Sequence, residues 1–579
     1  MTGEFPHTPR VLGVFFCVIF WVVYYRVMIK QLIQNEITKI LGADMRDFVV
    51  EKSSTFGNYA TNAVMMNAKN YGKNPREFAE FLVSELSKSD EINAVVEKME
   101  IAGPGFLNFY VKDEVVRGHI ADILSEKEKY GNNTSEEWKK IIIEYTDPNP
   151  FKEFHIGHLM TNTLGEALSR IIEACGAETK RACYQGDVGM HVAKAIYGMK
   201  NMEITDAHSL GKAYAYGSQN YDEHKEEIQE INRKVYDKSD DEINELYEKG
   251  RALSLEYFEH IYKKLGTHFD YYFFESKTGV LGKEIVEQNL NKVFFKSDGA
   301  VVFPGEDYGL HTRVFINSEG LPTYEAKELG LSKIKYDTYP YEESVIVTGN
   351  EVNDYFQVLL RAMSLVFPEL EKKTKHVSHG MLRLPSGKMS SRTGDVISAE
   401  SFLGALSAMS LEKISDREIE DKGKLADEIA VAGIKYSILK QSPGKDIIFD
   451  FDKSLSFEGD SGAYLQYAYV RTQSILRKAD IIGRARVSET VLDDSEISSL
   501  EKTLFEGLSN AVLLARKELS PNYITAYLTE VCREFNAYYE QNQILSNEHT
   551  AFRLTLVEAV GTVLKNGLTL LGIPAPEKM

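Results

Sequence analysis

The sequence has few cysteines, and their spacing defines neither a disulfide framework nor a zinc site. No two of them are arranged as C-x-x-C, and only four occur in 579 residues: Cys17, Cys175, Cys183 and Cys532. A secreted fold stabilised by disulfides is therefore excluded, and a reducing, cytoplasmic compartment is expected. For the same reason no zinc centre built on cysteines is expected.

The chain also lacks an excess of basic residues, internal repeats and low-complexity segments. Its 67 lysines and arginines are outnumbered by 86 aspartates and glutamates, which gives a net charge of -19. This charge argues against broad nonspecific binding to polyanions, although it does not exclude a local basic groove. A hydrophobic content of 43% is ordinary for a folded protein. The length allows roughly three or four domains.

One uncharged run stands out in a chain without other long hydrophobic stretches. Residues 11–25, VLGVFFCVIFWVVYY, are shorter than the roughly 20 residues that span a bilayer. They also lack the basic flank and the cleavage site of a signal peptide. Three explanations stay open: an upstream start-site artefact with Met28 as the true start, a membrane anchor, or a surface helix. Membrane contact is expected only if residues 1–27 are part of the protein.

Hydrophobic periodicity divides the remaining chain into three regions. Residues 28–124 are expected to form a small α+β module with a hairpin in KMEIAGPGFLNFYV, and the polar residues 125–138 a linker. Residues 137–400 alternate strands and helices, with a charged helical insertion at about 200–300, which predicts an α/β domain on a parallel sheet. Residues 401–579 are almost wholly helical and predict an all-α bundle.

The stretch DPNPFKEFHIGHLM, residues 147–160, follows the predicted buried strand KIIIEYT and precedes a predicted helix. Ligands of parallel sheets bind beyond the carboxyl ends of the strands, where this stretch is expected. Its two histidines, His155 and His158, could be metal ligands, polar residues at a helix start, or part of a nucleotide site. Metal binding is disfavoured because Gly157 favours a loop and no nearby cysteine or histidine completes a zinc set. A nucleotide site has a physical basis, because glycine admits a planar base and imidazoles at a helix N-terminus can donate to phosphate oxygens.

A second motif lies about 230 residues further on, in GMLRLPSGKMSSRTGDVIS, residues 380–398. Two glycines flank a lysine, two serines and an arginine, so the segment is rich in cationic and hydroxyl donors that suit a pyrophosphate leaving group. By itself such a cluster is usually a solvated turn. Together with the histidine stretch it becomes specific for nucleotide chemistry.

HIGH at residues 155–158 and KMSSR at residues 388–392 resemble the signature pair of class I aminoacyl-tRNA synthetases. From Met28 onward, the surrounding sequence resembles the arginyl-tRNA synthetases along nearly the whole chain. STFGNYATNAVMMNAK and IAGPGFLNFYV resemble the N-terminal tRNA-binding module, and CYQGDVGMHVAK resembles the Gly-Asp loop of the catalytic domain. GAYLQYAYVRTQSILRKA and LTLLGIPAPEKM resemble the anticodon-binding helix bundle. The resemblance implies a Rossmann-like parallel-sheet catalytic domain, an N-terminal α+β tRNA-binding domain and a C-terminal all-α anticodon-binding bundle.

The activity implied by the resemblance is that of an arginine–tRNA ligase. L-Arginine would react with ATP to give arginyl-adenylate, and the arginyl group would pass to the 3′ end of tRNA(Arg). Mg²⁺ is the expected counterion of the phosphates, no zinc is expected, and the enzyme is expected to be a cytoplasmic monomer. The alternatives are another class I synthetase, a nucleotidylyltransferase that shares the histidine stretch, and a catalytically inactive tRNA-binding paralogue.

The resemblance also implies two sets of site residues. ATP and its transition-state phosphate would be held by His155, Gly157, His158, Lys388, Met389 and Ser390. The signature usually carries a second lysine where this chain has Ser391, and either Arg392 or Lys152 could supply the missing charge. Lys152 is favoured because the family commonly carries a lysine there.

The implied arginine-binding residues are Glu144, Asn149, Asp187, Glu275, Tyr324 and Glu328. Carboxylates suit a guanidinium because its five donors can be gripped bidentately, although each residue taken singly would be an ordinary surface glutamate or core tyrosine. Three positions depart from the family: Glu328 replaces an aspartate, Asp147 a frequent serine and His191 a glutamine. Basic residues expected on the anticodon side are Arg471, Arg477, Lys478, Arg484 and Arg486.

Overall fold

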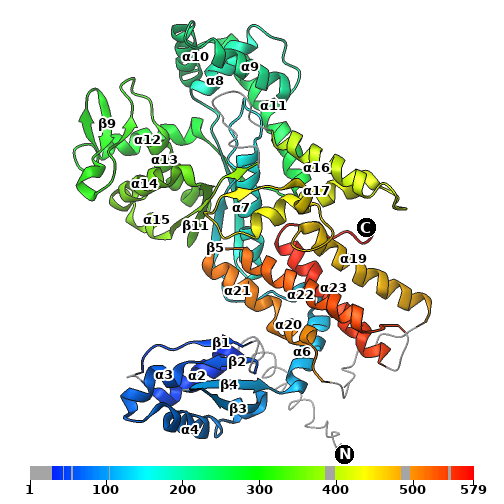
Figure 1. Ribbon diagram of the computed structural model, residues 1–579. Helices are drawn as coiled ribbons and strands as arrows, with labels where there is room; N and C mark the ends of the chain where they lie inside the picture. Colours follow the sequence, from blue (N-terminus) through cyan, green and yellow to red (C-terminus); the bar gives the residue numbers. More distant parts are fainter. Residues whose placement is uncertain are drawn as a thin grey trace, which may run out of the picture. The chain divides into compact units, whose positions relative to one another are not determined.

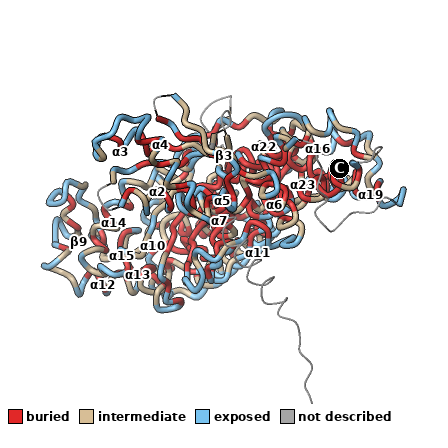
Figure 2. Tube along the Cα trace, turned by 90° about the horizontal axis from the view of Figure 1, so that it is seen from below, coloured by how far each residue is buried: buried red, intermediate tan, exposed pale blue. Residues whose placement is uncertain are grey.

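The computed structural model of the chain is shown in Figure 1. It describes residues 29–42, 45–53, 57–103, 105–384, 398–483, 496–545 and 549–579. The apolar run at residues 11–25 and the KMSSR motif therefore lie outside the described residues. Within those ranges, no helix is both long enough and apolar enough to cross a membrane. The burial of each described residue is shown in Figure 2, where the tube through the helix that follows the first parallel strand is largely red.

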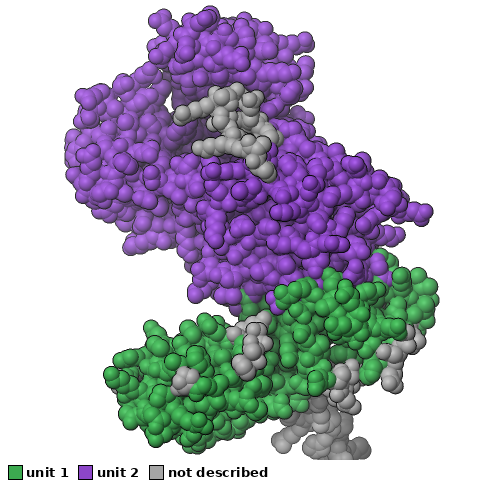
Figure 3. Space-filling view, viewed as in Figure 1, with its two compact units in different colours: residues 1–130, 475–510, 533–562 green, residues 131–474, 511–532, 563–579 purple. Residues whose placement is uncertain are grey.

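The chain divides into two compact units, coloured separately in Figure 3. Unit 1 comprises Met1–Tyr130, Ile475–Asn510 and Arg533–Thr562, and unit 2 comprises Gly131–Ser474, Ala511–Cys532 and Val563–Met579. The division at Tyr130 falls inside the polar stretch 125–138. The domain limits predicted from the sequence stay predictions.

The N-terminal part of unit 1 contains an antiparallel sheet in the order β1-β2-β4-β3. Its strands are β1 (Val50–Lys52), β2 (Tyr59–Thr61), β3 (Val96–Ala102) and β4 (Phe106–Val111). The predicted hairpin is confirmed, because Ala102 at the end of β3 pairs with Phe106 at the start of β4. The helices of this part are α2 (Ile29–Leu41), α3 (Ala63–Asn67), α4 (Pro75–Leu86), α5 (Asp90–Val95) and α6 (Asp113–Glu126), with 3-10 turns η1 (Ala68–Tyr71) and η2 (Lys127–Lys129). Their core includes the fully buried Ile33, Phe78 and Phe109.

Unit 2 is built on a five-stranded sheet in the order β12-β11-β5-β6-β7, and every pair in it is parallel. The strands are β5 (Lys140–Glu144), β6 (Glu178–Gln185), β7 (Tyr271–Phe274), β11 (Glu343–Gly349) and β12 (Thr374–His379). The predicted parallel sheet is thus confirmed. Helix α7 (Ile156–Ala174) connects β5 to β6, whereas β11 lies on the other side of β5. Such a change in the direction of strand addition opens a crevice at the carboxyl ends of the strands.

Two segments are inserted between elements of this sheet. The charged insertion between β6 and β7 is helical, as predicted, and contains α8 (Met190–Met199), α9 (Ala207–Gln219), α10 (Lys225–Asp237) and α11 (Asp241–Leu265). A second segment, between α12 (Glu275–Gln288) and α13 (Tyr324–Thr338), forms a separate antiparallel sheet of β8 (Phe295–Ser297), β9 (Ala300–Phe303) and β10 (Arg313–Ile316), with the turn η3 (Gly305–Tyr308). The turn η4 (Asn350–Val352) and helices α14 (Asn353–Val366) and α15 (Pro368–Lys373) lead from β11 to β12.

The C-terminal third is mainly helical, as predicted. Its helices are α16 (Ala399–Lys413), α17 (Lys422–Leu439), α18 (Phe451–Ser454), α19 (Gly462–Ile481), α20 (Ser499–Glu506), α21 (Leu508–Glu518), α22 (Asn522–Gln541) and α23 (Thr550–Leu570). The two-residue strands β13 (Leu382–Arg383) and β14 (Ile447–Ile448) pair in parallel. Residues of α19, α21, α22 and α23 belong to both units.

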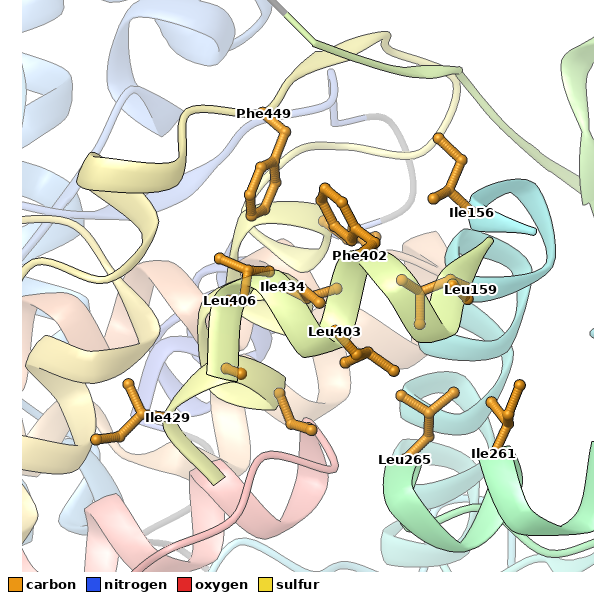
Figure 4. Close-up of a cluster of buried hydrophobic side chains, with 14 of the residues drawn as sticks. Ile156, Leu159, Ile261, Leu265, Phe402, Leu403, Leu406, Ile429, Ile434 and Phe449 are labelled. Carbon is orange, nitrogen blue, oxygen red and sulfur yellow. The ribbon is translucent and has the colours of Figure 1, made fainter. Parts of the chain in front are cut away.

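The first turns of α7 are fixed by a hydrophobic cluster in unit 2 (Figure 4). Ile156 and Leu159 of α7 belong to the same buried cluster as Phe402 of α16, Ile261 of α11 and Ile434 of α17. Burying an aliphatic or aromatic side chain of this size contributes about 1.5 to 3 kcal/mol. The start of α7, where both histidines lie, is therefore held from several helices at once.

Candidate active site

Polar side chains gather at the carboxyl ends of three neighbouring strands of unit 2. Glu144 is the last residue of β5, Gln185 is the last of β6, and Glu275 directly follows β7. Because β5, β6 and β7 are adjacent and parallel, these ends lie along one edge of the sheet. The histidine stretch follows β5 at the same edge, so His155 and His158 lie at the same end of the sheet as Glu144 and Glu275.

His155 and His158 belong to the start of helix α7 and not to a loop. His155 is the N-cap residue: its Nδ1 accepts hydrogen bonds from the N–H groups of Gly157 (3.1 Å) and His158 (3.4 Å). In return, Nδ1 of His158 accepts from the N–H of His155 (3.2 Å). The prediction that Gly157 favours a loop is wrong, since Gly157 lies in the first helical turn. A Cβ on it would lie 2.9 Å from Cε1 of His155, so the glycine makes room for the capping ring.

Both imidazoles are neutral, with the proton on Nε2. Because each Nδ1 accepts a backbone N–H, it carries no proton, and Nε2–H is left as the donor. Burial, followed by the charge of Lys152, lowers the pKa of His155 to about 4. Burial, the His155 ring and Lys152 also hold the pKa of His158 well below its usual range. The rings stack with centroids 3.6 Å apart at a helix N-terminus, which is favourable for an anion.

The loop between β5 and α7 has an unusual backbone conformation. Thr146, Asp147 and Phe151 have φ values of 81°, 46° and 69°, a region that costs a non-glycine residue about 1 to 3 kcal/mol. Two hydrogen bonds hold the loop: Asp147 Oδ1 accepts from the N–H of Tyr184 (2.7 Å), and the N–H of Phe151 donates to Ser254 Oγ (2.8 Å). This loop carries Asn149 and Lys152 into the site.

Two of the predicted arginine-binding carboxylates form buried ion pairs with lysines of α13. Glu144 Oε2 accepts from Lys335 Nζ at 2.5 Å, and Glu275 Oε2 accepts from Lys327 Nζ at 2.5 Å. Neither lysine was predicted as a site residue. In the sequence they look like ordinary lysines of a helix. Only the close packing of α13 on α12 and the contact of Lys335 with Glu144 of β5 reveal that all four charged groups are buried.

Glu328 and Asp147 share the same acidic region. Burial, followed by the charge of Glu144, raises the pKa of Glu328 and that of Asp147 well above their usual values. Burial likewise raises the pKa of Glu275, although Lys327 opposes this. Four carboxylates thus face two ammonium groups. A further cation in this region would lower these raised pKa values and stabilise the ionised carboxylates.

Asn149 and Glu275 both approach Gly186, which follows β6. A Cβ on Gly186 would lie 2.4 Å from Asn149 Oδ1 and 3.4 Å from Glu275 Oε1. Tyr324 begins α13 and is 63% exposed, with its ring centre 5.3 Å from Nζ of Lys327. The structure therefore brings Asn149, Glu275 and Tyr324 to one place.

Asp187 lies at the same strand end, but protein groups occupy its carboxylate. It is fully buried and accepts hydrogen bonds from Ser276 N (2.8 Å), Ser276 Oγ (2.8 Å) and Tyr247 OH (2.9 Å). Arg251 Nε is 3.4 Å away. These contacts tie the start of α12, which begins with Glu275, to the insertion helix α11.

In addition to burial, the charge of Lys152 lowers the pKa of three imidazoles. Besides those of His155 and His158, it lowers the pKa of His191, where burial is the larger cause and the value is about 3. His191 Nε2–H donates to the carbonyl of Gly186 at 2.8 Å. Nζ of Lys152 lies 5.0 Å from the ring centre of Tyr214 on α9.

The residues that flank the KMSSR motif contact the start of α7. After the motif, Ser398 forms an antiparallel bridge with His155, and the N–H of Ala399 donates to the carbonyl of Phe154 (2.7 Å). Before it, His379 Nε2 lies 2.8 Å from Thr161 Oγ1. Lys388, Met389, Ser390 and Arg392 themselves lie outside the described residues.

The basic residues predicted for the anticodon side lie on or beyond α19. Arg471, Arg477 and Lys478 are on this helix, and the guanidinium of Arg471 lies 5.0 Å from the ring centre of Tyr467. Arg484 and Arg486 are outside the part of the chain that the structure describes.

Three protein families match successive regions of the chain. "Arginyl tRNA synthetase N terminal domain" matches residues 28–111, "tRNA synthetases class I (R), catalytic domain" residues 119–451, and "DALR anticodon binding domain" residues 465–579. The arginine–tRNA ligase of Clostridium acetobutylicum is 31% identical, over 95% of this chain and 100% of the relative. That of Clostridium perfringens is 32% identical, over 88% and 92%.

Solved structures agree with these matches. The Thermus thermophilus arginyl-tRNA synthetase superimposes with a TM-score of 0.78 at 25% identity, covering 95% of this chain and all of the other. The arginyl-tRNA synthetase of Plasmodium falciparum superimposes with a TM-score of 0.80 at 21% identity, covering 95% and 98%, which supports the fold.

Proposed function

The chain belongs to the class I arginyl-tRNA synthetases, and on this premise we propose that it is an arginine–tRNA ligase. The observation that carries the assignment of the site is the convergence of two features at one sheet edge. One is the pair of neutral imidazoles at the start of α7, and the other is the acidic region around Glu275. The first suits the phosphates of ATP, and the second suits a guanidinium.

In the first step, an oxygen of the arginine carboxylate attacks the α-phosphorus of ATP. The new O–P bond forms as the bond to the pyrophosphate leaving group breaks, which gives arginyl-adenylate. In the second step, a hydroxyl of the terminal ribose of tRNA(Arg) attacks the arginyl carbonyl carbon as the bond from that carbon to the phosphate oxygen breaks. AMP leaves, and the hydroxyl proton is released. The first step needs no proton transfer by the protein, so its task is to align the reactants and stabilise charge.

We propose that the Nε2–H groups of His155 and His158 donate hydrogen bonds to phosphate oxygens of ATP. Adenine then lies beside Gly157. The neutral state of the two histidines supports this role, because they remain hydrogen-bond donors throughout the physiological pH range. Lys152 supplies the charge that Ser391 lacks. Its effect on the pKa of both histidines supports this assignment.

The family resemblance further assigns Lys388, Met389, Ser390 and Arg392 to the β and γ phosphates. Mg²⁺ is the expected counterion of these phosphates. The described residues contain no group of three or more His, Cys, Asp or Glu arranged to hold a metal ion. A Mg²⁺ ion held mainly by the phosphates of ATP and by water fits this chain best.

For the amino acid, we assign the guanidinium to Glu275 and Tyr324, and the α-ammonium to Glu144 and Asn149. Glu328 contributes negative charge. Asp187 acts indirectly, because its bonds to Ser276 hold the first turn of α12 and hence Glu275. The number of buried carboxyl groups that an added cation would ionise supports binding of a dibasic amino acid.

Arginine-dependent pyrophosphate exchange into ATP, with total tRNA present, tests this assignment. We expect exchange with the intact chain and a rise of at least about tenfold in the KM for arginine in Glu275→Gln, because a charged hydrogen bond is lost. Glu284→Gln, an exposed change on the same helix, is the matched control. Exchange that depends on a different amino acid, or no exchange with any amino acid, would refute the specificity.

We further propose a cytoplasmic monomer, with membrane contact only through residues 1–27. The scarcity of cysteine supports the compartment. Sedimentation and mass spectrometry of the native N-terminus test both points. A dimer, or a chain that lacks residues 1–27 and still pellets with membranes, would contradict this part of the proposal.

A further inference from the structure

One face of helix α9 lies against the loop that carries Lys152 and Glu153. The residues on this face, His208, Gly211 and Tyr214, are spaced by three. His208 Nδ1 is 2.9 Å from Glu153 Oε1, and a Cβ on Gly211 would lie 3.0 Å from Glu153 Cγ. Next along the face, the ring centre of Tyr214 is 5.0 Å from Nζ of Lys152. The close approach at Gly211 thus places Tyr214 within reach of the lysine.

Helix α9 is itself held firmly on α8. A Cβ on Gly198 of α8 would lie 2.1 Å from the carbonyl oxygen of Ala213, and a Cβ on Gly217 would lie 1.9 Å from that of Lys194. Only glycine permits such close contact between helix backbones. Because α8 begins directly after the Gly-Asp loop at the end of β6, Tyr214 is tied to the same sheet edge as the site.

The side chain of Lys152 must be restricted in its motion if its ammonium is to act at one point. A lysine side chain has a flexible four-carbon stem and a strongly hydrated ammonium, so it loses much conformational freedom when it acts at one point. The ring of Tyr214 is partly buried against the hydrophobic cluster of the insertion, which limits its motion. A cation over the face of such a ring is attracted by the negative charge there.

We propose that Tyr214 is a positioning residue for Lys152, whose ammonium its ring holds beside His155 and His158. The inference rests on the proposed function, because it assumes that Lys152 stabilises the phosphate during adenylate formation. It extends the active site to a helix of the insertion, for which neither motif gives a signal. Tyr214 touches no substrate in this account and acts only through the lysine.

A double-mutant cycle tests whether Tyr214 acts through Lys152. Tyr214→Leu, Lys152→Met and the double variant are compared in arginine-dependent pyrophosphate exchange with tRNA. We expect Tyr214→Leu to lower kcat about fivefold, as for the loss of a cation–π contact, with an unchanged KM for arginine. In the Lys152→Met background the same change is expected to have no further effect. Tyr214→Phe, which keeps the ring, should stay within about twofold of the parent.

Tyr221→Leu is the matched control. Tyr221 lies under another lysine of the insertion, with Lys194 Nζ 4.3 Å from its ring centre, and packs on the same hydrophobic cluster. We expect it to leave kcat unchanged. A comparable loss in this control would show that any disturbance of the insertion lowers the rate, and would overturn the inference.

The outcomes separate the two proposals. If Lys152→Met has no effect, the assigned role of Lys152 fails and the inference fails with it. If Lys152→Met impairs exchange but Tyr214→Leu has no effect, or has an equal effect in both backgrounds, only the inference is overturned.

Should Tyr214→Leu fail to fold, phenylalanines with increasing fluorination at position 214 keep the ring and weaken its negative face. We then expect kcat to fall with fluorination when Lys152 is present and to stay constant in Lys152→Met, and a constant kcat in both would overturn the inference.

Discussion

At His155, each ring nitrogen has its own partner. Nδ1 accepts the backbone N–H groups of Gly157 and His158, whereas Nε2–H is the group assigned to ATP. Asparagine can place an acceptor where Nδ1 lies, and glutamine can place a donor near Nε2. The two substitutions therefore separate helix capping from substrate contact.

We expect His155→Asn to keep the melting temperature close to that of the parent, because asparagine is a favoured N-cap residue. Its kcat for pyrophosphate exchange should fall about 10- to 100-fold, as for a lost hydrogen bond to a charged group. His155→Gln should show the opposite pattern, with a lower melting temperature and a smaller loss of rate. If both variants lose stability and rate in parallel, the two nitrogens do not have separate roles.

The buried, neutral state of His155 makes stability depend on pH in a defined window. The ordinary pKa of histidine is 6.5, and burial lowers that of folded His155 to about 4. Between these values the unfolded chain takes up a proton that the folded chain does not, so stability is lost as the pH falls from 6.5 toward 4. Melting temperatures should decline over this window, and less steeply in His155→Asn. An equal slope in the two proteins would contradict the assignment.

Lys327 opposes the effect of burial on Glu275. Without this lysine, burial would raise the pKa of Glu275 further, so that a larger fraction of the carboxyl would be protonated at a given pH. We expect Lys327→Met to raise the KM for arginine about tenfold or more at pH 7, with partial recovery at pH 9, whereas Lys327→Arg stays near the parent. A lower KM in Lys327→Met would mean that the lysine competes with arginine for the carboxylate.

At the scale of elements, the contact between α11 and the β5–α7 loop can be tested by substitution. A Cβ on Gly250 would lie 2.2 Å from the ring of Phe151, whose φ of 69° is held by that packing. We expect Gly250→Ala to destabilise the protein by about 1 to 3 kcal/mol and to lower kcat, because the loop carries Lys152.

Gly404→Ala is the matched control for this change. Gly404 lies within α16, and a Cβ there would have no atom within 4 Å. Alanine is the better helix former by about 1 kcal/mol, so this variant should be slightly more stable and equally active. If Gly250→Ala behaved like Gly404→Ala, the tight contact would not position the loop.

The secondary structure around the site could largely be predicted, because hydrophobic periodicity identifies β5, β6 and α7. The start of α7 could not, since Gly157 is read as a breaker unless the capping by His155 is known. The same limit applies to Lys327 and Lys335. Their burial depends on the packing of α13 against α12 and on the contact of Lys335 with Glu144 of β5, which no local pattern encodes.

At the scale of the whole molecule, the strand order explains how distant segments form one site. Strand β5 lies between β6 and β11 although about 200 residues separate β5 from β11 in the sequence. In the sequence, the motifs at residues 155–158 and 388–392 indicated a shared nucleotide site through their donor groups and through the family resemblance. The structure adds a physical link, because Ser398 pairs with His155.

The net charge of -19 coexists with a need to bind tRNA. Basic groups gathered on α19, such as Arg471 and Arg477, are the proposed contacts, and their interaction with phosphates depends on salt. We expect Arg477→Gln to raise the KM for tRNA and to reduce its dependence on salt concentration, without changing the KM for arginine. An unchanged KM for tRNA would remove α19 from the proposed interface.

The central claim is that this chain joins arginine to tRNA. Its most direct test is the aminoacylation of a total tRNA pool with each of the twenty amino acids in turn, in the presence of ATP and Mg²⁺. The account predicts that arginine alone is transferred and that Glu275→Gln and Lys152→Met reduce the transfer. Transfer of a different amino acid, or binding of tRNA without any transfer, would contradict it.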